Sequence, residues 1–350
     1  MKKILVAFDP HLSNINQAYE MFFAQDDEID WRLLSKPRWS EGNNLLVAIR
    51  AIYFLLKSFF TFAAGKYDLI HANGANLGIA AYCASFFRAK YIYTIHGCPH
   101  PALEKGEGIF KSFLAWLGER LMKIVVKRAV GVYAITEFTQ DELKRYYGIS
   151  SKVIYNGISL ESMHRVQNTK IRERYGLLNR EIFISVGRMI PYKDPRTVIE
   201  MFSHIRKSLS KAYLIFIGDG ELWEETVRFS QSKGLQNDIL FLKTVPFSEM
   251  CEWYSCATYF ISGCEVEGFG LAALEAASCG CIPVLPNGGS FPEIFVHDKY
   301  LYDKKNIESY VLPSYSDENL AYLSSIVKKF SWDNALNEYR EEYLRLARQF

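Results

Sequence analysis

Short apolar runs recur along the whole chain, separated by longer stretches whose apolar residues follow a helical period. The runs are rich in Val, Ile, Tyr and Phe, which favour strands. Since most runs are apolar throughout, we expect strands buried on both faces. In the first half the predicted strands are Ile4–Phe8, Ile29–Leu34, Leu69–Asn73, Tyr91–His96, Val132–Thr136 and Val153–Tyr155. In the second half they are Ile182–Val186, Leu214–Ile217, Ile239–Leu242, Tyr259–Ile261 and Ile282–Leu285, with helices such as Thr197–Ser208 and Leu222–Ser232 between them.

Two series of alternating strands and helices predict two domains of the doubly wound α/β class, each a parallel sheet with helices on both faces. The turn signal Asn156-Gly157 and the polar stretch Glu161–Lys170 separate the series. We therefore place the first domain at 1–160 and the second at 161–332. Open sheets bind ligands at the carboxyl ends of their strands, and interdomain clefts are favoured ligand sites. Residues that follow strands are thus expected to face a cleft between the domains.

The composition is that of an ordinary globular protein. The 350 residues are 49% hydrophobic and carry a net charge of +2, which argues against nucleic acid as a partner. Seven cysteines show no metal-ligand spacing, since Cys279 and Cys281 are separated by one residue and no second such pair occurs. The apolar run Ile4–Phe8 is short for a signal peptide, and Asp9 follows it at once. These features favour a cytoplasmic protein.

Two segments are candidates for contact with a membrane. Leu45–Ala64 is an apolar run of nearly spanning length, interrupted by Arg50 and Lys57 on one helical face. We interpret it as an amphipathic helix that packs on a sheet or touches a membrane surface, rather than as a span. Phe110–Arg128 contains a basic helical pattern that either lies on an anionic leaflet or packs with a solvated basic face. Its charged residues are Lys111, Glu119, Arg120, Lys123, Lys127 and Arg128.

The segment Glu267–Glu275 contains the most informative chemistry. It reads Glu-Gly-Phe-Gly-Leu-Ala-Ala-Leu-Glu, follows a predicted strand and opens a helix. Free N–H groups at a helix start favour phosphate, and Gly268 and Gly270 let the backbone approach a ligand closely. The two carboxylates can accept hydrogen bonds from hydroxyl groups. The segment suits a sugar nucleotide, and the alternative is an ordinary helix start with two solvated acids.

A second turn supplies positive charge. After the strand Ile182–Val186, the chain contains Arg188 and Lys193 ahead of a helix start, and both cations can neutralise a diphosphate. The alternative is two surface cations in a loop. Gly218 and Gly220 follow the next strand in a turn that either contacts a base or phosphate or is purely structural. This turn lacks the third glycine of the dinucleotide fingerprint.

In the first half, two histidines lie near the carboxyl ends of strands. His96 precedes a glycine and can donate to a sugar hydroxyl or transfer a proton near neutral pH, or it is a packed or capping histidine. His71 lies inside its strand, where a packed histidine is the usual outcome. The first loop, Asp9–Asn16, is polar and either touches the acceptor or is a plain capped loop.

Together these segments resemble the retaining enzymes of glycosyltransferase family 4, which have the GT-B fold of two facing Rossmann-like domains. The resemblance covers most of the chain and is strongest between Val153 and Pro283. The closing Phe330-Ser-Trp332 resembles the family's ending, which implies that a helix at about 333–350 packs back on the first domain. The matching segments are Ile154–Ile158, Ser185–Lys193, Ile217–Glu221, Glu267–Gly280 and Pro283-Val284.

The resemblance implies roles for the site residues. Arg188 and Lys193 hold the donor diphosphate, Glu275 the ribose hydroxyls and Glu267 the transferred sugar. His96 lies near the donor sugar. The remaining implied contacts to the donor come from Gly218, Gly220, Gly268, Phe269, Gly270 and Leu271, with Asn156 at the hinge.

The resemblance also implies a reaction. A hexose-type sugar passes with retention from a nucleotide diphosphate, UDP or GDP, to a glycan or lipid-linked glycan in bacterial surface polysaccharide synthesis. No bound metal or other cofactor is expected. The protein is expected in the cytoplasm, in peripheral contact with the inner face of the membrane through 110–128 or 45–64.

Three departures from the family pattern bear on these roles. The first loop contains His11-Leu-Ser-Asn14 where the family often has paired glycines. The usual proline before Ser262 is absent, and Gly263–Val266 lengthens the approach to Glu267. Glu265 is therefore a rival for the role of Glu267, although Glu267 keeps the spacing to Glu275.

Other functions remain open from the sequence. One is a GT-B enzyme of another reaction type, a nucleotide-sugar epimerase or a phosphorylase, the latter requiring pyridoxal phosphate on a lysine. A second is a catalytically silent subunit that binds a nucleotide sugar. The presence of Arg188, Lys193, Glu267 and Glu275 favours the transferase over the silent subunit.

Overall fold

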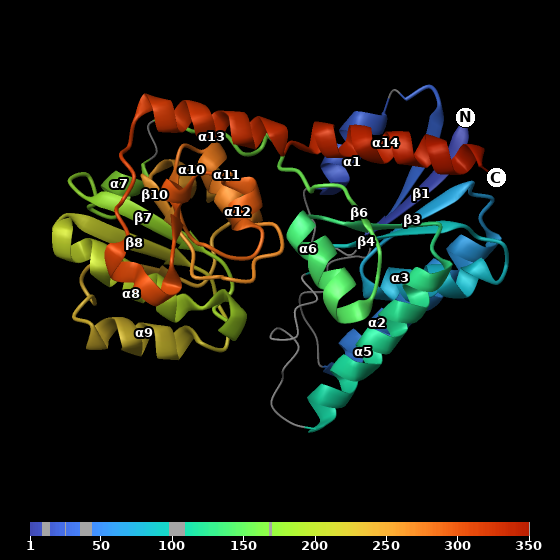
Figure 1. Ribbon diagram of the computed structural model, residues 1–350, viewed down its shortest axis with the longest axis horizontal. Helices are drawn as coiled ribbons and strands as arrows, with labels where there is room; N and C mark the ends of the chain where they lie inside the picture. Colours follow the sequence, from blue (N-terminus) through green and yellow to red (C-terminus); the bar gives the residue numbers. More distant parts are fainter. Residues whose placement is uncertain (9–14, 25, 36–43, 98–108, 168–169, 350) are drawn as a thin grey trace. The chain divides into compact units, whose positions relative to one another are not determined.

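The computed structural model describes residues 1–8, 15–24, 26–35, 44–97, 109–167 and 170–349. The chain divides into two compact units, which are described separately below. Unit 1 comprises Met1–Gly157 with Trp332–Phe350, and unit 2 comprises Ile158–Ser331. Each unit contains a six-stranded parallel sheet with helices on both faces (Figure 1). The doubly wound α/β class predicted from the sequence is confirmed.

The sheet of unit 1 has the strand order β2-β1-β3-β4-β5-β6, and every pair is parallel. The crossover from β2 to β3 changes direction at β1, as in other doubly wound sheets. Because β3 and β4 are neighbouring parallel strands, their carboxyl ends lie side by side, with Asn73 opposite Thr94 in the register. The strands are β1 (Lys2–Phe8), β2 (Ile29–Ser35), β3 (Leu69–Asn73), β4 (Tyr91–Ile95), β5 (Gly131–Ala134) and β6 (Lys152–Val153).

Alternation along β1 explains how helices cover both faces of this sheet. Ile4, Val6 and Phe8 pack in one core with α1 (Ile15–Phe23) and α14 (Trp332–Arg348). Leu5 and Ala7 point the other way. They share the second core with helices α2 (Asn44–Ala64), α3 (Ala75–Ser85) and α5 (Ile109–Arg128). Helix α6 (Glu137–Glu142) and the π-helical turn η1 (Leu143–Tyr147) follow β5.

A buried polar network ties α14 to the sheet of unit 1. His71 Nδ1 lies 2.6 Å from Tyr343 Oη, and its Nε2 lies 2.7 Å from Thr94 Oγ1. Thr94 Oγ1 also lies 3.0 Å from Tyr339 Oη. Burial, with repulsion from His96, holds the pKa of His71 well below its usual value, so the ring is neutral. His71 is thus a packed structural residue.

The sheet of unit 2 has the order β12-β11-β10-β7-β8-β9, again wholly parallel. Helices α8 (Pro195–Ser208) and α9 (Trp223–Ser232) lie on one side. Helices α10 (Met250–Ser255), α11 (Leu271–Ser278) and α13 (Asp317–Lys329) lie on the other (Figure 1). The strands are β7 (Glu181–Val186), β8 (Ala212–Ile217), β9 (Ile239–Leu242), β10 (Tyr259–Ile261), β11 (Ile282–Pro286) and β12 (Leu301–Tyr302). The short helices are α7 (Ile171–Arg174) and α12 (Phe291–Ile294).

Every strand predicted from the sequence is present, with its ends shifted by at most two residues. Strand β12 was not predicted, because its two residues lie between the charged residues Lys299 and Asp303 and no apolar run marks them. Leu45–Ala64 forms α2 and Phe110–Arg128 forms most of α5. Among the described residues, no helix combines the length and the apolar character needed to cross a membrane.

Candidate active site

The turn after β7 is rigid because its last residue caps the next helix. A short 3₁₀ turn, Pro191–Lys193, leads into Asp194, which adopts a left-handed conformation at φ 45°. The Asp194 carboxylate accepts hydrogen bonds from the backbone N–H of Thr197 at 3.1 Å and its hydroxyl at 2.7 Å. Pro195 starts α8 with its φ already set. Lys193 is therefore held immediately before a well-defined helix start.

Lys193 and Glu267, assigned different roles from the sequence, bind each other directly. Lys193 Nζ donates to Glu267 Oε2 at 2.6 Å, and the side chains are 26% and 18% exposed. Burial alone lowers the pKa of Lys193, but the attraction to Glu267 and the hydrogen bond that Lys193 donates to it outweigh burial and raise the pKa overall. The ammonium is therefore charged at neutral pH.

The segment that follows Glu267 turns sharply into α11. Gly270 caps the helix at φ 83°, a conformation that strains other residues, and α11 begins at Leu271. The side chain of Phe269 is buried and packs edge-on against Phe330, with ring centroids 6.0 Å apart. Phe269 can therefore offer a ligand only its backbone. Gly268 and Leu271 are partly exposed near the start of the helix.

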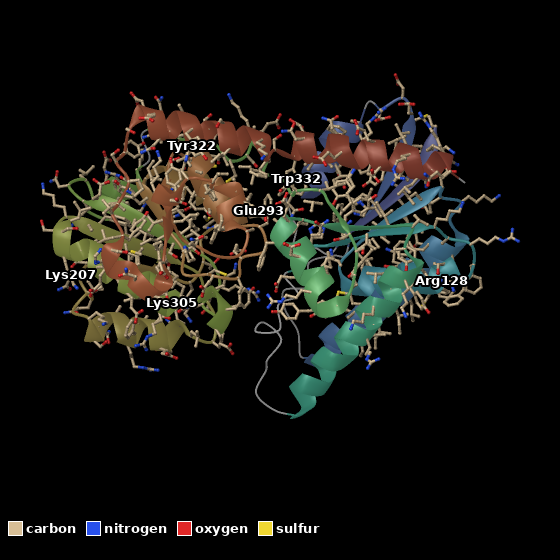
Figure 2. The ribbon with its side chains drawn as sticks, in the orientation of Figure 1. Arg128, Lys207, Glu293, Lys305, Tyr322 and Trp332 are labelled. Carbon is tan, nitrogen blue, oxygen red and sulfur yellow. The ribbon has the colours of Figure 1, made fainter. Side chains whose placement is uncertain are left out.

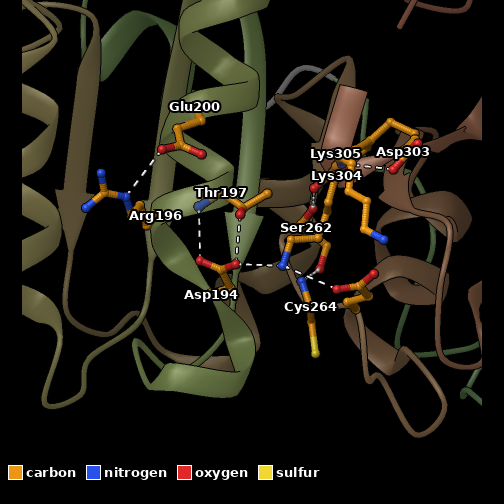
Figure 3. A network of polar contacts seen from close by, with 11 residues as sticks. Asp194, Arg196, Thr197, Glu200, Ser262, Cys264, Asp303, Lys304 and Lys305 are labelled. Atoms are coloured by element: carbon orange, nitrogen blue, oxygen red, sulfur yellow. Dashed lines mark hydrogen bonds and ion pairs between the residues drawn. The ribbon is translucent and has the colours of Figure 1, made fainter. Parts of the chain in front are cut away.

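Lys304 joins the turn that precedes α8 to the approach to Glu267. Its Nζ lies 2.7 Å from Asp194 Oδ2 (Figure 3). The same Nζ lies 3.6 Å from Glu265 Oε2. Burial alone lowers the pKa of Lys304, but its bonds to Asp194 and attraction to Glu265 raise it overall. Glu265 is 55% exposed and pairs with Lys304. Glu267, and not its rival Glu265, is thus the carboxylate in contact with Lys193.

Arg188 is exposed at the beginning of the same turn. Its guanidinium donates to Tyr192 Oη at 2.8 Å, and Lys193 Nζ lies 5.4 Å from the Tyr192 ring centroid. The Tyr192 side chain thus lies between the two cations. Both cations lie in the same turn of unit 2, where one anion can bind both of them.

Gly218 and Gly220 pack closely against the backbone of this turn. A side chain at Gly218 would meet the carbonyl oxygen of Gly187 at 1.8 Å, and one at Gly220 would meet that of Met189 at 2.3 Å. Backbone hydrogen bonds join the two turns, including Met189 N–H to the Asp219 carbonyl at 2.9 Å. The structural alternative therefore explains why both positions are glycine.

Glu275 lies one turn into α11 and has a different partner. Tyr254 Oη donates to Glu275 Oε2 at 3.2 Å. Burial raises the pKa of Glu275 to about 7, and the hydrogen bond from Tyr254 opposes that rise. The carboxylate therefore changes charge near neutral pH, and a ligand with hydroxyl donors would favour its ionised form.

In unit 1, His96 forms a separate polar cluster at the carboxyl ends of the strands. His96 Nε2 lies 2.7 Å from Asn73 Oδ1, and Asn73 Nδ2 donates to the Ala7 carbonyl at 3.2 Å. Burial lowers the pKa of His96 to about 4, and a polar contact with the Asn156 side chain, which lacks hydrogen-bond geometry, partly offsets this lowering. Since the ring is neutral and Asn73 Oδ1 accepts from Nε2–H, Nδ1 carries a lone pair. Neither His96 Nδ1 nor Asn156 Oδ1 has a hydrogen-bond partner among the described residues.

The sequence did not identify three residues that hold this chemistry in place. Asn73 follows a strand just as His96 does, so its position was an available signal. Tyr254 and Lys304 are distant in sequence from their partners, and no local pattern marks them. The expectation for the first loop rests mainly on residues 9–14, which lie outside the described residues.

Models of two glycosyltransferase families match successive parts of the chain. The model of glycosyl transferases group 1 matches residues 167–312, and that of glycosyltransferase family 4 matches residues 22–162. The matches correspond to the two units and together include every assigned site residue.

Individual proteins show more distant similarity. A GDP-mannose-dependent phosphatidylinositol monomannoside mannosyltransferase of Mycolicibacterium smegmatis is 28% identical over 37% of this chain and 36% of its own length. An alpha-monoglucosyldiacylglycerol synthase of Streptococcus pneumoniae is 26% identical over 61% of this chain and 52% of its own. The chain thus spans about a third to a half of these two relatives.

Solved structures confirm the fold over the whole chain. HepE of Anabaena, crystallised with UDP and glucose, superposes with a TM-score of 0.71 at 18% identity, covering 98% of this chain and 99% of its own. Sucrose-phosphate synthase of Thermosynechococcus elongatus superposes with a TM-score of 0.75 at 14% identity, covering both chains fully. With two family models matching most of the sequence and a shared architecture, the chain belongs to the group 1 glycosyltransferases of the GT-B fold.

Proposed function

We propose that this protein transfers a hexose-type sugar, with retention of configuration, from a nucleotide diphosphate donor to a glycan or lipid-linked glycan. The observation that supports this most is the Lys193–Glu267 pair beside the start of α11. A cation, a carboxylate and the backbone N–H groups of a helix start are there concentrated in one small region of unit 2. A diphosphate attached to a hydroxyl-rich sugar needs this combination of groups.

In the proposed complex, Lys193 and Arg188 neutralise the diphosphate, and the N–H groups at the start of α11 add hydrogen bonds. Ionised Glu275 accepts from the ribose hydroxyls. Glu267 exchanges its bond to Lys193 for hydroxyls of the transferred sugar. His96, which is neutral, accepts a hydrogen bond from a substrate hydroxyl through Nδ1.

The transfer itself needs few protein groups. The bond between the sugar's anomeric carbon and the diphosphate oxygen breaks, and the acceptor oxygen forms its bond on the same face. The acceptor proton passes to the departing diphosphate oxygen. Lys193 and Arg188 stabilise the negative charge that develops on the diphosphate, so the proposal requires neither a metal ion nor another cofactor.

The names of the relatives support the choice of substrates. The mycobacterial relative is named as dependent on GDP-mannose, and HepE was crystallised with UDP and glucose. Both curated relatives are named for lipid products or acceptors. We therefore propose UDP or GDP as the nucleotide, and an acceptor at the inner face of a bacterial membrane in surface glycan synthesis.

A two-step experiment tests this function. A thermal-shift screen against UDP, GDP, ADP and their sugar conjugates identifies the donor, because a ligand specific for the folded state raises the melting temperature. Transfer or slow donor hydrolysis is then compared for Lys193→Ala, Glu267→Ala and the surface control Glu200→Ala. We expect losses of at least about a hundredfold for the first two variants and little change for the control. Near-normal turnover in both site variants contradicts the proposal, and NMR of the anomeric proton tests retention.

A further inference from the structure

Helix α2 of unit 1 is apolar on two opposite faces. Phe54 and Phe62 are almost completely buried in the core of the unit, and Ser58 between them on the same face is also buried. The opposite face is exposed to an extent unusual for large apolar side chains. It carries Ile49, Ile52, Tyr53, Leu56 and Phe60, each between 51% and 64% exposed. Their spacings of three and four residues place them in one stripe along the helix.

This stripe continues onto the end of α3. The Phe59 ring contacts both Phe60 and Phe87, with centroid separations of 5.2 and 5.8 Å. Phe86 and Phe87 are 58% and 64% exposed. We call the stripe and these two phenylalanines the outer patch. Its apolar side chains are contiguous, whereas exposed apolar residues elsewhere on a protein surface are usually scattered.

Basic groups border the outer patch. Arg50 and Lys57 lie on α2, and Arg88 directly follows Phe87. The Arg128 guanidinium lies 4.1 Å from the Phe86 ring centroid, near the end of α5 (Figure 2). Helices α2 and α3 contain neither Asp nor Glu. The patch is therefore apolar in its centre and positive at its border.

We infer that the outer patch docks unit 1 on the surface of an anionic lipid bilayer. Aromatic and aliphatic side chains enter the headgroup boundary, while Lys and Arg bind anionic headgroups, each adding about 1 kcal/mol near the surface. The absence of acidic residues from α2 and α3 favours an anionic bilayer over a second copy of unit 1, whose identical basic border would repel it.

The structure favours α2 over the basic helix α5 as the docking element. From Gly118 onward, Ile124 is the one exposed large apolar side chain that the structure describes on α5, at 40%. Lys123 lies over the Tyr147 ring at 5.7 Å. In its described part, α5 thus supplies charge but no apolar stripe.

The position of the patch deepens the proposed function. In a parallel sheet each helix begins near the carboxyl ends of the strands and runs back along the sheet. The stripe therefore starts, at Ile49, on the side of unit 1 where Asn73 and His96 lie. If the proposed transfer is correct, a docked enzyme presents this edge to an acceptor that is anchored in the bilayer.

Vesicle co-sedimentation tests the docking without reference to transfer. We expect the protein to bind phosphatidylcholine vesicles that contain phosphatidylglycerol, and to bind pure phosphatidylcholine less. The triple variant Ile52→Ser, Tyr53→Ser, Phe60→Ser should lower the partition coefficient at least about tenfold. The matched control replaces two exposed apolar residues of unit 2, Leu178→Ser and Val311→Ser, at 62% and 81% exposure, and should bind as wild type.

Two charge variants test whether α2 or α5 is the docking element. Lys57→Glu with Arg88→Glu should remove the preference for anionic vesicles, and Arg120→Glu with Lys123→Glu should weaken it less. The inference is overturned if the serine variant binds vesicles like wild type, or if the α5 variant alone abolishes binding. It is also overturned if light scattering shows a wild-type dimer that the serine variant dissociates, which identifies a second copy as the occupant.

The same variants distinguish this inference from the proposed function. The serine variant should keep the wild-type melting temperature and the wild-type thermal shift with the donor nucleotide, because its side chains are exposed and lie outside the donor site. Wild-type protein that binds nucleotide but no vesicle overturns the docking and leaves the proposed function standing. Wild-type protein that binds vesicles but no nucleotide does the reverse.

Discussion

Neutralising Glu267 should tighten the binding of the free nucleotide diphosphate while it abolishes transfer. In the structure the Lys193 ammonium has a carboxylate partner, Glu267, at 2.6 Å. A diphosphate must compete with that carboxylate for Lys193 and also approach its negative charge. Glu267→Gln keeps a hydrogen-bond acceptor of the same shape but removes the charge, so the diphosphate no longer competes against an ion.

The size of the effect follows from the geometry. At 2.6 Å and an effective dielectric constant of about 20, the attraction between the two charges is about 6 kcal/mol before desolvation is counted. Desolvation of partly buried groups offsets most of it, and about 1 to 3 kcal/mol remains. If half of this remainder opposes the diphosphate, the dissociation constant should fall about twofold to thirteenfold. Loss of the contact to the transferred sugar should lower turnover about a hundredfold to a thousandfold.

Isothermal titration calorimetry with the nucleotide diphosphate measures the first change, and transfer kinetics the second. Glu200→Gln is the matched control, since it removes one carboxylate from the exposed pair with Arg196 on the neighbouring helix. Lys193→Met should lower the affinity for the nucleotide diphosphate. Adding Glu267→Gln to Lys193→Met should not increase that affinity. If Glu267→Gln lowers the affinity for the nucleotide diphosphate as Lys193→Met does, then Glu267 positions Lys193 instead of competing with the diphosphate for it. That result would show the reasoning to be wrong.

Three further predictions concern Lys304, Glu275 and the buried polar network around Tyr343. Lys304→Met should lower transfer about tenfold and raise the KM for donor, because the Lys193 turn loses its tie to the Glu265 segment, whereas Lys305→Met should change neither. Nucleotide affinity should be highest above pH 7 and fall as pH drops below the Glu275 pKa of about 7, because ribose hydroxyls need the ionised acceptor; titration calorimetry of Glu275→Gln should show no such dependence. Tyr343→Phe should cost about 1 to 3 kcal/mol of unfolding free energy by leaving a buried nitrogen of His71 without its partner, and a midpoint equal to wild type in a urea titration would contradict this.

The fold was readable from the sequence because its signal is repeated along the chain. Each long strand is a run of β-branched and aromatic residues, and both sheets are parallel, so the runs are not confused with amphipathic strands. The two-residue strand β12 has no such signal. The sequence places the domain boundary at 160/161, from the turn Asn156-Gly157 and the polar stretch after it, and the first segment of unit 1 runs to Gly157.

The site was readable only in part, since topology fixes where a strand ends but not which side chains then meet. Lys193 and Glu267 were both named as residues that follow strands, yet their contact depends on the left-handed turn at Asp194 and the capping glycine at Gly270. Gly218 resembled a ligand contact because the sequence does not distinguish a glycine needed for backbone packing from one needed for close approach of a ligand. Only the position of the Gly187 carbonyl separates the two.

The pairing of Lys193 with Glu267 bears on how both halves of the proposed donor are recognised. An isolated charge in a partly buried site is costly, and here each of the two charges satisfies the other. In the proposed complex the diphosphate takes Lys193 and the sugar takes Glu267. A diphosphate without a sugar leaves Glu267 without its partner, and a sugar without a diphosphate does the same to Lys193. Only the intact donor satisfies both charges, so the pair couples recognition of the two halves of the donor without any movement of the backbone.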